Sequence, residues 1–259
     1  PGTATGLRAA VLGSSGFVLP PLPNHLFTRD TTCWIYGGVS LNPMAMVARR
    51  RETAHLEAIY RFHPLFADAG FECWFGGVDR DHGTATIEGG DVHVIGHGAV
   101  LVGMGERTTP EAVEALARRL FAAGAASILL AVALPTRRAF MHLDTVMTMV
   151  SPDTIVAYPG VLDELRTWTV RPTDNADEMV IHPEPDLFTP LTAALGIGEV
   201  HVLTTGGDGW EAEREQWDDG NNVLAVAPGV VVAYERNVDT NTKLRKAGIE
   251  VVTIAGSEL

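Results

Sequence analysis

The sequence predicts an α/β fold in which four related β-β-α-β units pack against one another. The first observation is that the order strand, strand, helix, strand recurs along the 259 residues. The second is that a repeat of this size cannot bury a hydrophobic core alone, so the units must pack in a ring or a stack. The third is a composition of 46% hydrophobic and 20% charged residues, which is ordinary for a globular protein with a sizeable core.

The second and fourth units show this order most clearly. In the second unit we expect strands at residues 84–87, 92–95, 99–102 and 127–134. Its helix follows a cap at Thr108-Thr109, a proline at the first helical position and an early acidic residue, and it ends at Gly124. In the fourth unit we expect a helix at residues 240–247, ended by Gly248, and strands at residues 222–227, 230–234 and 250–254.

The first and third units are less regular. In the first unit a strand at residues 31–36 precedes a Gly37-Gly38 turn and a helix from Arg49 to about Phe62, and the unit ends near Phe75. In the third unit we expect helices at residues 161–168 and 187–195, and strands at residues 144–149, 154–158, 180–181 and 200–203. A loose helix at residues 6–15 and a proline-rich break at residues 20–24 precede all four units.

Composition excludes several classes of function. The formal net charge of −13 repels phosphate backbones, so nucleic acid is not an expected partner. No apolar run reaches the roughly 18 residues that a membrane span needs, so no membrane partner is expected either. The first 16 residues lack the pattern of a signal peptide, and two cysteines fit a reducing compartment. We therefore expect a cytoplasmic protein.

The segment 141–149 carries the first candidate functional residues. It is apolar and β-branched apart from His142 and Asp144, and it predicts a strand. Because side chains alternate between the faces of a strand, His142 and Asp144 are expected to point the same way. A proton-transfer group beside a carboxylate suits general acid/base chemistry. The alternative is a strand end at which both side chains only satisfy backbone groups.

Polar residues also stand near the start of the first strand in each unit. They are Asp30, Glu88, His142 with Asp144, and Asn221 with Asn222. If rotation relates the units, these positions converge on one axis and line a cavity. This convergence favours a site over the structural alternative.

The charges in such a cavity require a cationic partner. Asp30, Glu88 and Asp144, with Asp91 as a fourth candidate, repel one another in a low dielectric unless a cation lies between them. A divalent metal and a guanidinium both fit this requirement. Arg49 and Arg107, at equivalent places in their units, suit an anionic end of the ligand. Arginine carries a guanidinium and a carboxylate at opposite ends.

Six segments in sequence order resemble the bacterial arginine deiminase family, which belongs to the guanidino-modifying, amidinotransferase-like superfamily. The match extends from about residue 17 to residue 259 and rests on residues 21–30 (PLPNHLFTRD), 49–53 (RRRET), 87–91 (IEGGD), 105–108 (GERT), 141–146 (MHLDTV) and 222–237. The resemblance implies a pseudo-symmetric α/β propeller of ββαβ modules, with about four of its five modules present. It also implies hydrolysis of L-arginine to L-citrulline and ammonia, a step of arginine catabolism that uses no metal and no organic cofactor.

The resemblance also implies residue roles. A cysteine thiolate of the family attacks the guanidinium carbon and forms a covalent amidino-enzyme. His142 corresponds to the general acid/base and Glu88 to its orienting partner, while Asp30 and Asp144 hold the guanidinium. Arg49 and Arg107, with Asn24, correspond to the residues that hold the carboxylate and amino group of the substrate. Phe27 corresponds to the residue that packs on its aliphatic stem. The resemblance further implies a homo-oligomer in the full-length form.

One departure from the family pattern concerns the nucleophile. In the family this cysteine follows the Ser-Glu-Leu at which the sequence ends, and neither Cys33 nor Cys73 stands at that position. The first module and a helical insertion precede residue 21 in the family and are not matched. We therefore expect residues 1–259 to form one incomplete catalytic domain that does not hydrolyse arginine alone.

Three alternatives stay open at this point. One is a related amidinotransferase or another guanidino hydrolase, although Arg49 and Arg107 argue against agmatine, which lacks a carboxylate. Another is a non-catalytic arginine-binding protein. The third is a metal hydrolase that uses Asp30, Glu88, His142 and Asp144. Cys33, Cys73 and the remaining histidines are interpreted as structural or solvated.

Overall fold

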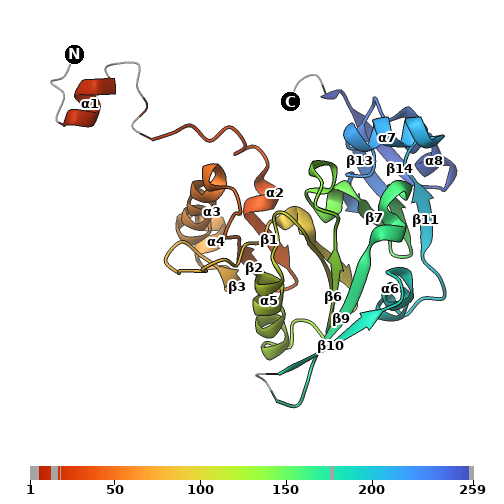
Figure 1. Ribbon diagram of the computed structural model, residues 1–259, viewed down its shortest axis with the longest axis horizontal. Helices are drawn as coiled ribbons and strands as arrows, with labels where there is room; N and C mark the ends of the chain where they lie inside the picture. The colour runs from red at the N-terminus through yellow and green to blue at the C-terminus, as the bar shows by residue number, and fades with distance from the viewer. Residues whose placement is uncertain (1–5, 13–16, 18, 176–177, 257–259) are drawn as a thin grey trace.

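The computed structural model describes residues 6–12, 17, 19–175 and 178–256. Within these residues the strands form four sheets, one for each predicted unit (Figure 1). Their strand orders are β1-β2-β3, β10-β9-β6-β5-β4, β11-β8-β7 and β12-β13-β14. The prediction of four units is therefore confirmed.

The strands are β1 (Thr32–Ile35), β2 (Gly38–Leu41), β3 (Glu72–Gly76), β4 (Val92–Gly96), β5 (Ala99–Met104), β6 (Ile128–Ala133), β7 (Met147–Ser151), β8 (Thr154–Ala157), β9 (Arg166–Pro172), β10 (Met179–Glu184), β11 (His201–Thr204), β12 (Leu224–Ala227), β13 (Val230–Tyr234) and β14 (Glu250–Ile254). The α-helices are α1 (Leu7–Leu12), α2 (Thr28–Thr31), α3 (Arg50–Phe62), α4 (Pro64–Ala67), α5 (Pro110–Ala122), α6 (Phe188–Leu195), α7 (Gly209–Trp217) and α8 (Val238–Lys246). Short 3-10 helices include η3 (Gly89–Asp91), η4 (Arg138–Phe140), η5 (Leu143–Thr145) and η6 (Pro159–Glu164).

Each unit has the same internal topology. Its first two strands form an antiparallel hairpin, and its last strand runs parallel to the second. A parallel pair needs a crossover connection, which the helix of the unit supplies. This topology places the segment before each first strand at the same end of every sheet, where the predicted site residues stand.

Helix α5 shows how local sequence specifies an element. The Thr109 side chain accepts a hydrogen bond from the N–H of Ala112, and Pro110 occupies the first turn. Val113, Leu116 and Leu120 are buried in a core shared with the second sheet. The chain leaves the helix through Gly124, whose φ of 65° lies in the left-handed region. The predicted bounds of this helix are confirmed.

The third unit contains an insertion that the sequence interpretation missed. Residues 161–168 are not a helix, because η6 ends at Glu164 and β9 begins at Arg166. Strands β9 and β10 form an antiparallel hairpin, and β9 pairs with β6. The hairpin therefore extends the sheet of the second unit, and α6 and β11 complete the third unit after it.

Two predicted strands and one helix also need correction. Residues 84–87 form no strand, and in the segment 141–149 the strand begins only at Met147. The first part of that segment is held by η5, where the Thr145 hydroxyl donates to the carbonyl of His142. Helix α7 was not predicted, although Asp208 and Glu211 form a capping box at its start.

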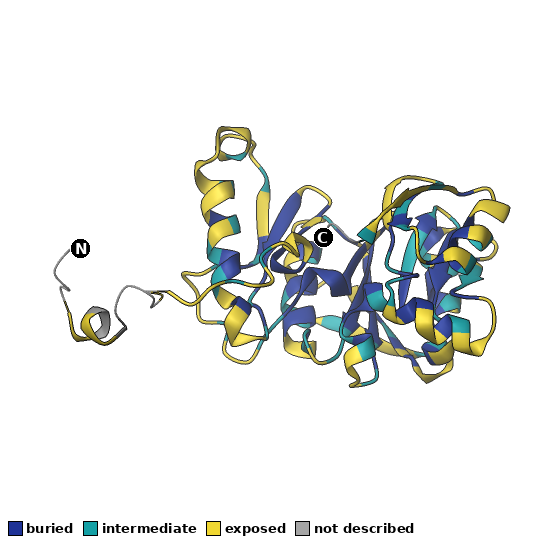
Figure 2. Cartoon of the chain, turned by 90° about the horizontal axis from the view of Figure 1, so that it is seen from above, coloured by how far each residue is buried: buried dark blue, intermediate teal, exposed yellow. Residues whose placement is uncertain are grey.

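The N-terminal segment lies apart from the sheets. Figure 1 shows α1 away from the sheets, and residues 19–27 lead into α2 without forming a helix or strand. The predicted helix at residues 6–15 is observed as Leu7–Leu12, and residues 13–15 lie outside the described part. In Figure 2 the sheet interiors are buried, whereas this segment is mostly exposed. Among the described residues, no helix has the length and apolar character that crossing a membrane requires.

Candidate active site

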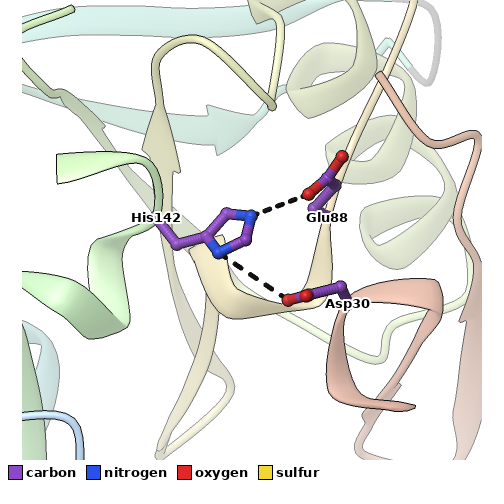
Figure 3. A group of neighbouring side chains, drawn as sticks. All are labelled: Asp30, Glu88 and His142. Atoms are coloured by element: carbon purple, nitrogen blue, oxygen red, sulfur yellow. Dashed lines mark hydrogen bonds and ion pairs between the residues drawn. The ribbon is translucent and has the colours of Figure 1, made fainter. Parts of the chain in front are cut away.

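Three buried side chains from three units meet at one point (Figure 3). Nε2 of His142 lies 2.8 Å from Oε2 of Glu88, and Nδ1 of the same ring lies 3.7 Å from Oδ1 of Asp30. Asp30 belongs to α2, Glu88 precedes η3, and His142 precedes η5. The predicted convergence of these residues is therefore observed, although His142 lies at the bend before η5 and not in a strand.

A glycine makes this close approach possible. Gly90 follows Glu88 by two residues in η3. A Cβ atom at position 90 would lie 2.8 Å from Cγ of His142 and 2.8 Å from Oδ2 of Asp144. Real Cβ atoms do not approach other atoms so closely, so any other residue here would displace His142 or Asp144.

Asp144 lines a large cavity. This cavity measures about 810 Å³, and Arg29, Cys33 and Asn222 also line it. Oδ2 of Asp144 lies 3.5 Å from Nε of Arg29, while Oδ1 is buried and has no hydrogen-bond partner among the described residues. Burial raises the pKa of Asp144 to about 6, against the opposing charges of His142 and Arg29. The free oxygen makes Asp144 a candidate acceptor for a cationic ligand.

Arg49 is already paired with carboxylates. Its Nη1 lies 2.6 Å from Oδ2 of Asp30, and its Nη2 lies 2.9 Å from Oε2 of Glu52. Nη2 also donates to the carbonyl oxygens of Asn24 and Phe27. Binding of a substrate carboxylate by Arg49 would therefore require some of these contacts to open.

Arg107 lies on the other side of the cluster. Its Nη1 is 3.4 Å from Oε2 of Glu88, and its Nε is 3.6 Å from Oε1 of Glu106. Because Glu88 also contacts His142, Arg107 contributes positive charge to the same carboxylate that binds the imidazole.

Asn24 and Phe27 are placed differently from the charged residues. Both residues are exposed, and their backbone carbonyls accept hydrogen bonds from Arg49. The structure therefore links them to the site through the main chain of the segment before α2.

The protonation of His142 is set by opposing effects. Burial disfavours the imidazolium, whereas the hydrogen bond to Glu88 and the charges of Asp91, Asp144 and Asp30 favour it. The carboxylates prevail and raise the pKa of His142 to about 9. The ring therefore carries a positive charge at neutral pH and can donate a proton to a leaving group.

Sequence reasoning gave Arg29 and Thr108 no role at the site, whereas it did expect Asn221 to lie there. Arg29 pairs with Asp144, and the Thr108 hydroxyl donates to Oδ2 of Asp91 at 2.6 Å. Nδ2 of Asn221 donates to the carbonyl of Asp144 at 3.3 Å, which ties the fourth unit to the site. The repeated placement of polar residues before each first strand pointed to Asn221, but no sequence signal identified its partner.

Neither cysteine has the properties of an activated nucleophile. Cys33 is buried beside the cavity, and burial raises the pKa of its thiol to about 11. Burial also raises the pKa of the Cys73 thiol. Because the thiolate is the reactive form, both groups are poor nucleophiles at neutral pH.

The ligand atoms at this site favour the binding of a metal ion, but the neighbouring arginines oppose it. One ligand atom each from Asp30, Glu88 and His142 lies within 4.8 Å of the others, which suits a small cation. However, guanidinium groups of Arg49 and Arg107 already contact two of these residues. Their positive charges oppose the binding of a divalent cation and favour an organic ligand that can replace them.

A family model described as arginine deiminase matches residues 1–259 of this chain. DDAH from Pseudomonas aeruginosa, solved as a mutant complexed with citrulline, has a TM-score of 0.62 at 16% sequence identity, with 92% of this chain and 71% of that chain covered. A complex of AgrE with L-arginine has the same TM-score and identity, with coverage of 92% and 29%. An inosamine-phosphate amidinotransferase from Streptomyces griseus has a TM-score of 0.55 at 15% identity, with coverage of 88% and 61%. The TM-scores show that the fold is shared, and this confirms the predicted α/β propeller. At identities this low, the similarity shows the fold alone.

Proposed function

This chain belongs to the arginine deiminase family, and we propose that it carries the substrate-binding and proton-transfer groups of an arginine deiminase. Its fold is shared with guanidino-group hydrolases and transferases. The proposed reaction hydrolyses L-arginine to L-citrulline and ammonia. The main support is that the buried imidazole of His142 lies between Glu88 and Asp30, while Asp144 lines a large cavity and has one buried carboxylate oxygen without a hydrogen-bond partner among the described residues.

Asp30 and Asp144 are the proposed guanidinium ligands. Each carboxylate already contacts a guanidinium of the chain itself, Asp30 that of Arg49 and Asp144 that of Arg29. These contacts support the match between the carboxylates and a planar cation with several N–H donors. An incoming arginine would replace Arg29, whose side chain is 54% exposed and therefore free to move outward.

His142 is the proposed proton carrier, and Glu88 is its orienting partner. A thiolate forms a bond to the guanidinium carbon, the C–N bond breaks, and the leaving ammonia takes the proton of His142. Neutral His142 then accepts one proton from the attacking water. As the C–S bond breaks and the carbonyl forms, the second water proton is lost to solvent, and citrulline and the thiolate are released. The nucleophile in this proposal is a cysteine other than Cys33 and Cys73, because the pKa values of both are raised. We therefore propose that residues 1–259 are an incomplete catalytic domain. From the family resemblance we also propose that the full-length protein is cytoplasmic and self-associates.

Calorimetric titration of the 259-residue chain with L-arginine and agmatine tests the proposed substrate. We expect L-arginine to bind and agmatine to bind at least tenfold more weakly, since agmatine offers no carboxylate to Arg49 or Arg107. Asp144→Asn should weaken L-arginine binding by about tenfold or more, since a hydrogen bond to a charged group contributes roughly 1.5–3 kcal/mol. Asp163→Asn, at an exposed position away from the cavity, is the matched control.

No citrulline should form from arginine in the same samples. Absence of arginine binding, or equal binding of arginine and agmatine, would contradict the proposed substrate. Formation of citrulline by the 259-residue chain would contradict the proposed need for another cysteine.

A non-catalytic arginine-binding protein is the second candidate. It is favoured by the raised pKa of Cys33, the cysteine that lines the cavity. Such a protein would bind arginine with the same dependence on Asp144, but it would leave arginine unchanged even when the cysteine segment of the family is joined to residue 259. A citrulline assay on that longer protein separates the two candidates.

A further inference from the structure

Asp91 forms an internal support for the site. It lies in η3, three residues after Glu88, and it is completely buried. Its Oδ1 accepts the backbone N–H of Leu143 at 2.9 Å, and its Oδ2 accepts the Thr108 hydroxyl at 2.6 Å. The same hydroxyl oxygen accepts the backbone N–H of Glu88 at 3.1 Å. A chain of hydrogen bonds therefore runs from Glu88 through Thr108 and Asp91 to Leu143.

These hydrogen bonds hold the backbone on both sides of the contact between Glu88 and His142. One end holds the backbone of Glu88, and the other holds the residue that follows His142. Both carboxylate oxygens of Asp91 accept a hydrogen bond, so the group cannot rotate without losing one of them. The three segments involved come from η3, from the loop before α5 and from η5. A main-chain hydrogen bond from Thr109 to the carbonyl of Thr86 joins the first two, and the Asp91 side chain joins both to η5.

The space around Asp91 is shaped to admit the carboxylate. A Cβ atom at Gly103 would lie 2.5 Å from Oδ1 of Asp91 and 2.9 Å from Cβ of Leu143. A larger residue at position 103 in β5 would therefore separate Asp91 from Leu143. The absence of a side chain at this position keeps η3 and η5 in contact.

We propose that Asp91 is a positioning residue that fixes the hydrogen bond between Glu88 and His142 and places a buried negative charge beside the imidazole. This inference rests on the proposed function, because it assigns to Asp91 the support of the proton carrier in that reaction. Asp91 does not contact the cavity and is not proposed to touch the substrate.

The charges around His142 indicate what the loss of Asp91 would do. Glu88, Asp91, Asp144 and Asp30 all favour the imidazolium. The positive charges nearby lie on arginines that pair with these carboxylates: Arg107 with Glu88, Arg29 with Asp144 and Arg49 with Asp30. Asp91 has no arginine partner in the described structure, so its charge acts on His142 without such compensation. Burial raises the pKa of Asp91 to about 7, against the charge of His142 and the bonds from Thr108 and Leu143.

The test is a titration of His142 by nuclear magnetic resonance of nitrogen-labelled histidine, with His142→Asn used to assign the signal. Asp91→Asn retains the shape and one acceptor oxygen but removes the charge. We expect it to lower the pKa of His142 by about one unit, since an opposite charge at close range shifts a pKa by roughly 1–3 units. Thr108→Val removes the hydroxyl that joins Glu88 to Asp91, and it should weaken arginine binding. Thr108→Ser keeps the hydroxyl and should bind arginine as the parent protein does.

A folded Asp91→Asn protein in which the pKa of His142 stays within about 0.3 units of the parent value would overturn the inference. If Asp91→Asn does not fold, the Thr108 pair decides: equal arginine affinity in Thr108→Val and the parent protein also overturns it. Failure of the parent protein to bind arginine, with the His142 shift as expected, would instead refute the proposed function and leave the placement of charge by Asp91 intact.

Discussion

At His142, burial and neighbouring charge act in opposite directions. The ring is 7% exposed, so the cost of burying an imidazolium is close to its full value. The four carboxylates nevertheless raise its pKa from 6.5 to about 9. The folded protein thus binds a proton that the unfolded chain releases near pH 6.5, and stability depends on pH in that window.

The free energy of unfolding should therefore fall as pH rises from 6.5 to about 9. The stabilising contribution of His142 is fully present below 6.5 and is lost as pH passes the folded-state pKa. One proton changes the unfolding free energy by at most about 1.4 kcal/mol per pH unit. Urea unfolding at successive pH values measures the slope, which should be smaller in His142→Asn. His182→Asn, at an exposed histidine, is the control. Equal slopes in all three proteins would refute this assignment.

Sequence reasoning identified the site residues more readily than their partners. Asp30, Glu88, His142 and Asp144 could be grouped because each stands before the first strand of its unit. The pairing of Arg49 with Asp30 depends on a contact across 19 residues that no periodicity predicts. Asp91 was recognised as a further carboxylate, but its role depends on Thr108 and Leu143, which the fold brings to it.

Among the secondary-structure elements, those with strong local signals were predicted well. Helix α5 has a capping threonine, a proline and a terminal glycine, and α8 ends before Gly248. The segments at residues 141–146 and 161–168 were misread because apolar residues occur both in strands and in tight buried turns. The alternation of Thr167 and Thr169 was the signal for β9 that the sequence interpretation passed over.

Helices α7 and α8 are joined through a buried glutamate. Glu215 of α7 accepts the N–H groups of Asp239 and Thr240 and the Thr240 hydroxyl, and it caps α8, whose own Asn237 makes no side-chain cap. Glu215→Gln should lower the free energy of unfolding by about 1–3 kcal/mol, because its amide group presents a donor to N–H donors.

Urea unfolding of this variant beside Glu213→Gln makes the comparison, since Glu213 is exposed on the same helix and its substitution should change stability by less than about 0.5 kcal/mol. Equal effects of the two substitutions would show that Glu215 does not cap α8.

At the scale of the whole molecule, the second and third units share one hydrophobic core. Leu101 and Leu130 of the second sheet pack with Leu143, Ile155 and Leu191 of the third unit. Leu143 is fully buried and directly follows His142, so the packing that joins the units also supports the site.

Leu143→Ala and Leu191→Ala form a matched pair that separates these two effects. Both side chains are fully buried in the same core, and each substitution should cost about 2–5 kcal/mol of unfolding free energy. Only Leu143→Ala should also lower the pKa of His142 and weaken arginine binding, because it disturbs η5. If Leu191→Ala changed the pKa of His142 as much, the site would depend on the core in general and not on Leu143.

The sequence predicted the repeated units and their number, because each unit has its own strand, turn and helix signals. The arrangement of the units followed from the family resemblance, since packing between units depends on core contacts that are distant in sequence. The β9-β10 hairpin illustrates this limit. It lies in the third unit by sequence but joins the sheet of the second, and β6 is the strand that receives it.

The distribution of Asp30, Glu88 and His142 over three units also bears on the order of folding. Strand pairing and helix formation within a unit need only neighbouring stretches of chain, whereas the imidazole meets its carboxylates across 54 residues or more. Long-range closure is entropically costly and therefore slow. We therefore expect the contact between His142 and Glu88 to form late in folding, after most of the secondary structure.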